Sequence, residues 1–216
     1  MRKFQFMRTA IAVPMLAAGL LAAFPDPPST TAPAAKKETV VLAGGCFWGM
    51  QGIFEHVKGV LSTEVGYSGG SKQTANYERI ERGDTNHAES IKITWDPAKI
   101  TYGQLLKIYF SAAHDPTTLN RQHNDVGTQY RSSIFYTSDE QKKISEDYIK
   151  SLNDAHVFKS PIVTKVVPLE AFYRAEEYHQ HFLDNNPTQG YIAAVDIPLL
   201  ENFKRTYPEF YTPGVR

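Results

Sequence analysis

Two residues of this sequence have the types needed for thiol chemistry assisted by an acid. They are Cys46, the only cysteine among the 216 residues, and Glu89. A cysteine thiolate is an intrinsically strong nucleophile, and a carboxylic acid that keeps its proton can donate it to a leaving oxygen. Gly44 and Gly45 precede the cysteine, so the backbone can turn tightly there and leave the sulfur uncrowded.

Cys46 is expected where a strand turns into a helix. Residues 39–43 are β-branched and apolar, which is typical of a buried strand. Four apolar side chains then share one helical face before the stop at Gly59: Phe47, Met50, Phe54 and Val57. The partial positive charge of a helix N-terminus would favour the thiolate. A lone cysteine is also often a small buried core residue, and its position alone leaves that alternative open.

Glu89 begins the clearest strand of the chain, residues 89–95, in which apolar and polar side chains alternate. Ile91, Ile93 and Trp95 form the apolar face of this strand, and Glu89 lies on the same face. A carboxyl in that place is desolvated, which raises its pKa and keeps it protonated. A glutamate at a strand end can equally be solvated, so the spacing alone does not decide its role.

The motif Gly45-Cys46-Phe47-Trp48-Gly49 resembles the active-site motif of the A-type peptide methionine sulfoxide reductases. Three further blocks match in the same order, at residues 76–78, 83–89 and 124–132, and a weaker one lies at 175–180. Together they cover residues 39–196, and ordered matches of this kind are poorly explained by chance. The resemblance implies reduction of methionine S-sulfoxide, free or in proteins, and hence protein repair after oxidative damage.

The resemblance also implies roles for particular residues. Glu89 would protonate or hydrogen-bond the sulfoxide oxygen while Cys46 attacks the sulfur, leaving methionine and a cysteine sulfenic acid. Five further residues would bind the substrate. Phe47 and Trp48 would form an apolar slot for the S-methyl group, a use that fits Trp48 because it lies off the apolar helical face. Tyr77 and Tyr130 would hold the oxygen, and Asp125 the backbone of the methionine sulfoxide.

The chain departs from the common family pattern where resolving cysteines would stand. Residues 80–82 are Ile-Glu-Arg, and the Gly-Tyr pair near the C-terminus is followed by Ile192. Asn86 replaces the glycine usual before His-Ala-Glu. With one cysteine no internal disulfide can form, so an external thiol such as glutathione or thioredoxin is expected to reduce the sulfenic acid. No bound cofactor is expected.

Two other function classes can be weighed against this one. A papain-like cysteine protease needs Cys-Gly-Ser-Cys-Trp around its nucleophile, and this sequence lacks that motif. A non-catalytic binding module would bind its ligand regardless of alkylation at Cys46. A metal site is not expected, because His179 and His181 do not share a face if the segment is helical.

Composition narrows the remaining classes. The chain has 23 Lys and Arg against 23 Asp and Glu, which gives no indication of a basic surface for nucleic acid. Its hydrophobic content of 42% and its length suit one sizeable domain with a proper core. We expect a monomer whose substrates are oxidised proteins or free methionine sulfoxide.

The N-terminus has the pattern of a signal peptide. Arg2, Lys3 and Arg8 precede an apolar run over residues 10–24, and small residues at 21–23 or 32–34 offer cleavage sites. An uncleaved anchor is the alternative, but 15 helical residues span only about 22 Å of a ~30 Å hydrocarbon core. We therefore assign 1–34 to a signal peptide and the start of a linker, and 35–216 to a single catalytic domain. The protein is expected to be exported, periplasmic or secreted, without stable membrane insertion after cleavage.

The rest of the pattern predicts an α+β fold with a mixed sheet and helices on its faces. Further strands are expected at 62–70, 130–136 and 163–168, and helices at 101–113, 138–153 and 173–185. Residues 114–127 read as a long polar loop, and the tail after Pro198 as irregular. The family resemblance implies a ferredoxin-like α/β plait with long ordered loops.

Overall fold

The computed structural model describes residues 24–28 and 37–214. The signal peptide and cleavage sites predicted within residues 1–34 therefore lie, apart from 24–28, outside the described residues. No helix in the described part is long and apolar enough to cross a membrane.

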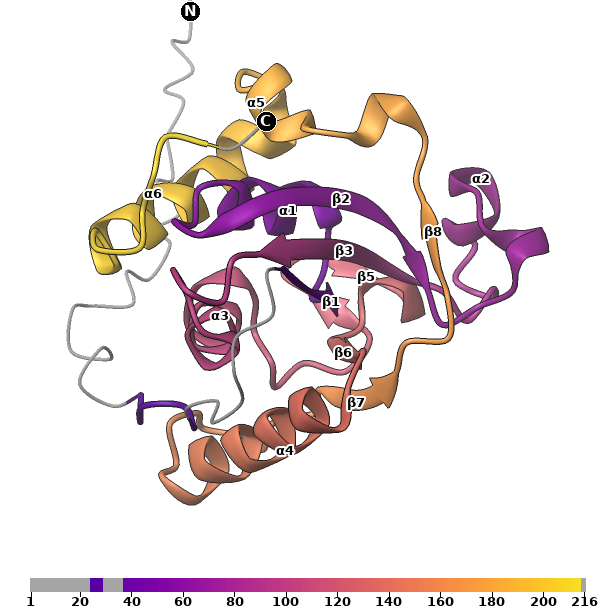
Figure 1. Cartoon of the computed structure of the whole chain (residues 1–216). Coiled ribbons are helices and arrows are strands. Elements are labelled where there is room, and N and C mark those ends of the chain that lie inside the picture. Colours follow the sequence, from indigo (N-terminus) through magenta and orange to yellow (C-terminus); the bar gives the residue numbers. More distant parts are fainter. Residues whose placement is uncertain (1–23, 29–36, 215–216) are drawn as a thin grey trace, which may run out of the picture.

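A six-stranded mixed sheet forms the centre of the fold (Figure 1), in the order β7-β6-β1-β3-β2-β8. Its strands are β1 (Glu38–Ala43), β2 (Val60–Ser68), β3 (Ala88–Trp95), β6 (Ser133–Tyr136), β7 (Lys165–Pro168) and β8 (Phe172–Arg174). Only the β6–β7 pair is parallel, and the other neighbours are antiparallel. Two short strands, β4 (Arg121–Gln122) and β5 (Asp125–Val126), form a separate hairpin.

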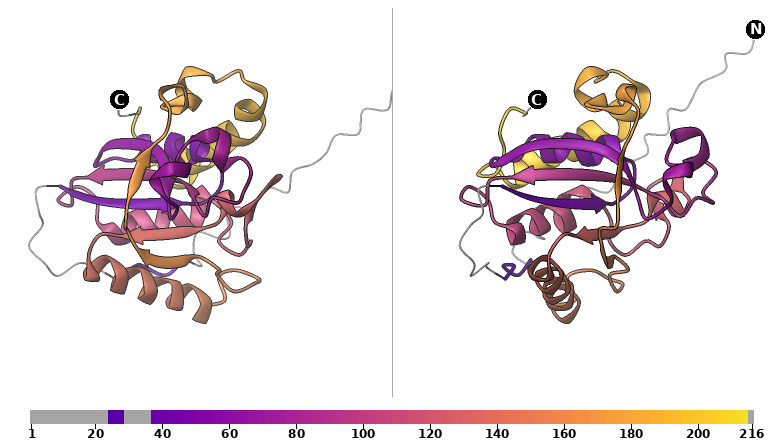
Figure 2. Two further views of the ribbon diagram at one scale, coloured as in Figure 1. Left: turned by 90° about the vertical axis from the view of Figure 1, so that its right-hand side faces the viewer. Right: turned by 45° about the vertical axis from the view of Figure 1, so that its right-hand side comes forward.

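The helices build the main core with one face of the sheet. The longer ones are α1 (Phe47–Glu55), α3 (Tyr102–Ile108), α4 (Asp139–Asp154) and α6 (Ile197–Thr206). Successive side chains of β1 point to opposite faces of the sheet. Val40 and Leu42 belong to the main core on the helix side, while Val41 and Ala43 belong to a smaller cluster with Phe135 on the other face. The connection from β7 to β8 crosses that second face (Figure 2), so β1 is buried on both sides.

Local signals explain why two of the predicted helices begin where they do. Thr101 caps α3 in a reciprocal capping box with Gln104, and Ser138 accepts a hydrogen bond from the Gln141 backbone at the start of α4. The predicted helix 101–113 continues beyond α3 as a π-helix over Tyr109–Ala113. The mixed α+β architecture predicted from the sequence is confirmed.

The prediction of a helix over residues 173–185 is wrong. The segment begins as β8, passes through a 3₁₀ turn at Glu177–His179 and ends in the short helix α5 (Phe182–Asn185). Gln180 explains the difference, because its side-chain amide bonds both the backbone N–H and the carbonyl of Val65 on β2. These long-range bonds tie the segment to the sheet and override its local helical preference.

Two other expectations need correction. The strand expected from residue 130 begins only at Ser133, and Tyr130 ends a 3₁₀ turn. The tail that was expected to be irregular contains α6, preceded by a π-helix over Ile192–Asp196. Pro198 lies in the first turn of α6, where a proline needs no backbone donor and is tolerated.

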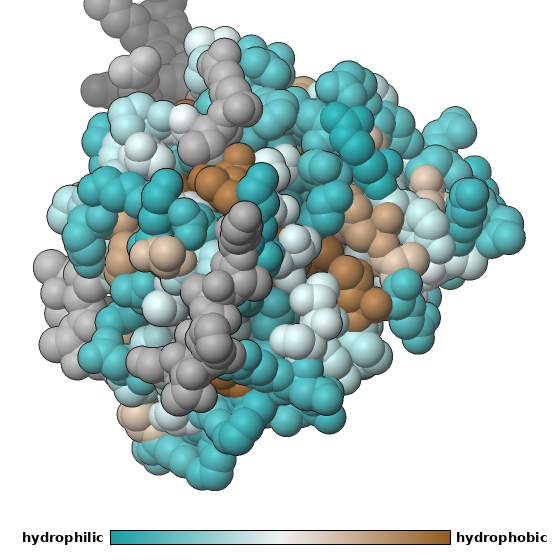
Figure 3. Space-filling model, in the orientation of Figure 1, coloured by the Kyte–Doolittle hydropathy of each residue, from teal (hydrophilic) through white to brown (hydrophobic). Residues whose placement is uncertain are grey.

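The face of the molecule drawn in Figure 3 is mostly hydrophilic, with hydrophobic residues confined to small patches. Among the described residues, the exposed large hydrophobic side chains are Leu61, Leu119, Val126 and Tyr178. Within the described residues, the large apolar side chains thus lie mainly in the two cores.

Candidate active site

Cys46 lies between the end of β1 and the first residue of α1, as the sequence predicts. The two preceding residues must be small, because a Cβ on Gly44 would lie 2.8 Å from the His114 ring. One on Gly45 would lie 2.7 Å from Gln122, and Gly45 also has a φ of +98° that other residues rarely adopt. The glycines therefore let the chain turn sharply and present Cys46 at the helix N-terminus.

Glu89 lies directly beside this turn. Its side chain is buried, and Oε2 accepts a hydrogen bond of 3.1 Å from the Phe47 backbone N–H, the residue after the cysteine. Burial raises the pKa of Glu89 to about 8, against the lowering effect of that hydrogen bond. The predicted desolvated carboxyl on the apolar face of β3 is thus confirmed, and it is protonated at neutral pH.

The helix N-terminus favours the Cys46 thiolate as expected, but this effect is outweighed by others, so the prediction of a net preference for the thiolate is wrong. Burial raises the pKa of the Cys46 thiol above its ordinary value, and Glu89 and Asp196 raise it further when they are ionised. The hydrogen bond from the Trp48 backbone acts in the opposite direction but is the weaker effect. The resting nucleophile is therefore a neutral thiol that must lose its proton during the reaction.

Tyr77 and Tyr130 lie beside Glu89 and Cys46 and are both half-buried. Burial raises the pKa of each phenol, and Glu89 and Cys46 raise it further when they are ionised. Both hydroxyls therefore keep their protons and can donate hydrogen bonds. The structure brings the two tyrosines to the reactive pair from two short helical segments that are far apart in the sequence. Their role in binding the sulfoxide oxygen stays a prediction.

Phe47 and Trp48 contact a histidine that sequence reasoning considered only as a metal ligand. The ring of His179 lies 5.0 Å from that of Phe47, and its Nδ1 accepts a hydrogen bond of 3.1 Å from the Trp48 indole. Trp48 also stacks on Phe182 at 3.9 Å and is only partly buried, which agrees with its place off the core face of α1. Burial lowers the pKa of His179, so the ring is neutral.

Glu176 is a second residue that the sequence analysis missed. Its carboxylate accepts hydrogen bonds from the Tyr77 backbone N–H at 3.0 Å and from the Tyr67 hydroxyl at 2.8 Å. It therefore fixes the start of the short helix α2 (Tyr77–Ile80), which positions the Tyr77 ring. The weak sequence match at 175–180 was the available signal for both Glu176 and His179.

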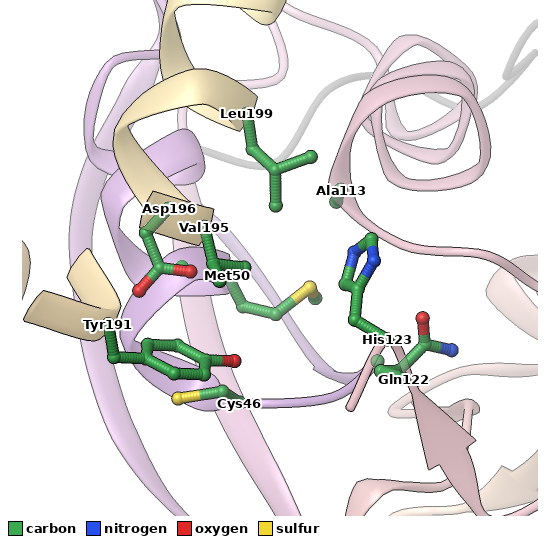
Figure 4. Close-up of a pocket in the computed structure, with 11 residues that line it drawn as sticks. Cys46, Met50, Ala113, Gln122, His123, Tyr191, Val195, Asp196 and Leu199 are labelled. Carbon is green, nitrogen blue, oxygen red and sulfur yellow. The ribbon is translucent and has the colours of Figure 1, made fainter. Parts of the chain in front are cut away.

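Asp125 lies in the β4–β5 hairpin, where its Oδ2 accepts a hydrogen bond of 2.6 Å from the Tyr191 hydroxyl. The sequence analysis mentioned Tyr191 only because Ile192, and not a resolving cysteine, follows it. Figure 4 shows Tyr191, Cys46 and Asp196 on one side of a pocket, with Gln122 and His123 on the other. Asp125 thus joins the site through a tyrosine that itself lies beside the nucleophile.

Asn86, which replaces a glycine of the family pattern, has a left-handed backbone with φ of 62°. Asparagine tolerates this conformation better than other non-glycine residues. Its side-chain amide also donates a hydrogen bond of 2.8 Å to the Gly69 carbonyl. The substitution therefore preserves the turn that leads into Glu89.

The two histidines considered for a metal have other partners. His179 accepts from Trp48, and His181 pairs with the buried carboxylate of Glu55. Within residues 24–28 and 37–214, no group of three or more His, Cys, Asp or Glu side chains is arranged to hold a metal ion.

Comparison with known proteins places this site in a family. The family model for peptide methionine sulfoxide reductase matches residues 38–210. Peptide methionine sulfoxide reductase MsrA 2 of Mesorhizobium japonicum is 53% identical over 175 residues, which are 81% of this chain and 90% of that protein. The enzyme of the same name from Synechocystis is 50% identical over 85% of each chain.

Solved structures agree with the sequence comparison. The crystal structure of reduced Mxr1 from Saccharomyces cerevisiae has a TM-score of 0.62 at 36% identity and covers 76% of this chain and 92% of that chain. Methionine sulfoxide reductase A of Corynebacterium diphtheriae also has a TM-score of 0.62, at 33% identity, over 76% of this chain and 84% of that one. With its cysteine at the turn into α1 and a protonated glutamate beside it, the chain belongs to the peptide methionine sulfoxide reductase family.

Proposed function

We propose that this oxidoreductase reduces the S epimer of methionine sulfoxide, free or in proteins, and so repairs oxidatively damaged proteins. The observation that supports this most directly is the placement of the Glu89 carboxyl against the backbone N–H that follows Cys46. The Cys46 sulfur can therefore attack the sulfur of a sulfoxide while Glu89 donates a proton to the oxygen of the same sulfoxide.

In the proposed reaction Glu89 gives its proton to the sulfoxide oxygen, and the Cys46 sulfur attacks the substrate sulfur. This attack forms a bond between the two sulfurs while the S–O bond breaks and the protonated oxygen leaves as hydroxide. The hydroxide then adds to the Cys46 sulfur and the S–S bond breaks, which releases methionine and leaves Cys46 as a sulfenic acid, so the methionine sulfur gains the two electrons that Cys46 loses. The proton lost by the thiol replaces the one that Glu89 gave, so thiol plus sulfoxide becomes sulfenic acid plus thioether. Loss of the thiol proton is easier when Glu89 is neutral, because its charge otherwise raises the thiol pKa.

The neighbouring residues fit the binding of such a substrate. The hydroxyls of Tyr77 and Tyr130 would donate to the sulfoxide oxygen, since their raised pKa values keep them protonated. Phe47 and Trp48, held by His179, would provide the slot for the S-methyl group. Asp125, oriented by Tyr191, would accept from the substrate backbone.

We also infer that the four central strands form a ferredoxin-like plait. The chain order strand, helix, strand, strand, helix, strand is that of the split βαβ motif. The antiparallel neighbours β6-β1-β3-β2 support this assignment.

A single-turnover experiment tests the proposed function. Without reductant, the protein should form one equivalent of methionine per chain from the S epimer and none from the R epimer. Because no second cysteine exists, Cys46 should then remain as a sulfenic acid that a dimedone-type probe traps, as read by mass spectrometry. Turnover should resume when an external thiol is added. Methionine release from both epimers, or no release at all, would contradict the proposed activity.

We further propose that the protein acts after export, as a periplasmic or secreted enzyme. The support is the basic start followed by a short apolar run and small residues within 1–34. N-terminal sequencing of the protein from its native host should find a mature chain that begins after residue 23 or 34. A cytosolic chain that begins at Met1 would overturn this expectation.

A further inference from the structure

A pocket beside Cys46 shares Cys46 and Tyr191 with the proposed sulfoxide site, but its other lining residues are different. Its walls come from α1, the β4–β5 hairpin, and the segment that leads into α6 (Figure 4). Besides Cys46, the residues that matter here are Met50, Gln122, His123, Tyr191, Val195 and Asp196. Cys46 lines this pocket, whereas Glu89 and Phe47 do not. The cysteine thus faces a second space as well as the Glu89 side.

Asp196 is the acidic side chain of this pocket, and the fold makes room for it. The residue is only 2% exposed. A Cβ on Gly49, in the first turn of α1, would collide with its Oδ1, so that glycine is required for the carboxyl to lie there. The Asp196 carboxyl therefore packs directly against the first turn of α1, the helix that begins after Cys46.

One oxygen of this carboxyl has no partner among the described residues. Oδ2 of Asp196 is buried and makes no hydrogen bond. The nearby Tyr191 hydroxyl does not satisfy it, since that hydroxyl donates to Asp125. A buried polar oxygen without a donor costs free energy unless it is protonated or meets a ligand. Burial, and next the charge of Asp125, raise the pKa of Asp196 to about 7, so the group can both accept and donate a proton near neutrality.

We propose that this pocket admits the external thiol that reduces the Cys46 sulfenic acid, and that Asp196 is the acid–base group of that step. The inference rests on the proposed function, because it needs the sulfenic acid as its substrate. The pocket has a volume of about 20 Å³, so it would admit only the S–H end of a small thiol such as glutathione and not the surface of a folded protein. The sulfoxide-binding side, with Glu89, takes no part in this second half-reaction.

The Asp196 carboxylate accepts the S–H proton of the incoming thiol, and the resulting thiolate attacks the Cys46 sulfur. The S–O bond of the sulfenic acid breaks, and Asp196 returns the proton to the departing hydroxide, which leaves as water. The thiol sulfur is oxidised and the Cys46 sulfur reduced as the mixed disulfide forms. A second thiol then releases Cys46 as thiol and carries away the disulfide product.

The test separates the two half-reactions in the variant Asp196→Asn, which keeps the shape but cannot exchange a proton. Each protein is first oxidised by one equivalent of S-sulfoxide and then mixed with glutathione, and the dimedone-reactive sulfenic acid is followed with time. The asparagine variant should lose at least about 10² in the rate of sulfenic acid reduction, the range of general acid–base catalysis. Methionine formation in the first half-reaction should change far less.

The pH dependence of the glutathione reaction distinguishes proton transfer by Asp196 from a purely structural role, because a structural role would not change that dependence. The groups that face Asp196 are Cys46, Asp125, Tyr191 and His123. In the wild type, glutathione reduction should rise with pH around 7 as the carboxylate forms. In Asp196→Asn the rise should move toward the free-thiol pKa of about 8.5. Glu201→Gln, an exposed carboxylate of α6, is the matched control and should behave as wild type.

Three results would overturn the inference. These are an Asp196→Asn variant that recycles at the wild-type rate, equal losses in both half-reactions, and an unchanged pH profile. Failure to form any sulfenic acid in the wild type would instead contradict the proposed function itself.

Val195→Phe tests the pocket without touching the carboxyl. Val195 is partly exposed and lines the pocket, so a larger side chain should narrow it. Reduction by glutathione should slow several-fold more than reduction by the smaller 2-mercaptoethanol. Equal slowing of the two thiols, or none, would show that thiols reach Cys46 by another path.

Discussion

Replacing Cys46 by serine is expected to abolish methionine sulfoxide reduction while leaving the fold intact. A serine oxygen cannot take over the two-electron oxidation that the sulfur undergoes, so no sulfenic acid can form. The loss should be at least about 10⁴-fold, as is typical when the nucleophile of an enzyme is removed. Methionine release from the S-sulfoxide with excess dithiol is the measurement.

Thermal unfolding and Cys46→Ala provide the controls for this variant. Cys46 is partly exposed, belongs to neither core cluster and makes no side-chain cap of α1, so neither substitution should change the unfolding transition greatly. Both variants should also lose the dimedone adduct, because Cys46 is the only cysteine of the chain. Cys46→Ser retaining even a tenth of the wild-type turnover would refute the assignment of the nucleophile.

The parts of the site that could be predicted from sequence are those specified by neighbouring residues. The strand before Cys46, the glycine turn, and the helix after it all lie within residues 38–55, and local patterns are sufficient to identify them. The burial of Glu89 could also be predicted, because the alternation of β3 places it on an apolar face. The side-by-side placement of Glu89 and Cys46 came only from the family resemblance and not from spacing.

The residues that sequence reasoning missed act over long sequence separations. His179 meets Trp48 across 131 positions, and Glu176 meets the Tyr77 backbone across 99. No local pattern reports such contacts, and the segment that carries them was predicted to be helical. The raised pKa of Cys46 was missed for the same reason, since burial and the charge of distant Asp196 outweigh the helix N-terminus.

Replacing Glu89 by glutamine is expected to slow methionine formation by about 10²–10⁴-fold, the usual contribution of a general acid. The amide can still donate a hydrogen bond to the sulfoxide oxygen, and its carbonyl can still accept from the Phe47 N–H. What the variant lacks is a transferable proton, so some activity should survive. The single-turnover rate of methionine formation measures this step without interference from thiol recycling.

The same substitution should make the protein more stable at alkaline pH. The pKa of Glu89 is about 8 in the folded protein against 4.5 for the free side chain, so the native state binds the extra proton between these values. Stability therefore falls as pH rises from about 4.5 to about 8, because the unfolded chain releases that proton first. Glutamine carries no charge to bury, and the variant should escape this loss, on the order of a few kcal/mol. Denaturant unfolding at acidic and alkaline pH measures the difference.

The ratio of the wild-type rate of methionine formation to the Glu89→Gln rate, followed with pH, reports on proton donation by Glu89. Both proteins need the Cys46 thiolate, whose fraction rises with pH, and the ratio removes the part of that dependence that they share. Above pH 8 the charge of Glu89 also raises the thiol pKa in the wild type alone, which lowers the ratio in the same direction as loss of the proton donor. The acid form of Glu89 is present below its pKa of about 8 and disappears above it. The ratio should therefore be constant at neutral pH and fall by about tenfold per pH unit above 8. Glu146→Gln, an exposed glutamate of α4, should match the wild type throughout. A ratio that stays constant across this range would show that Glu89 holds the sulfoxide oxygen without giving it a proton.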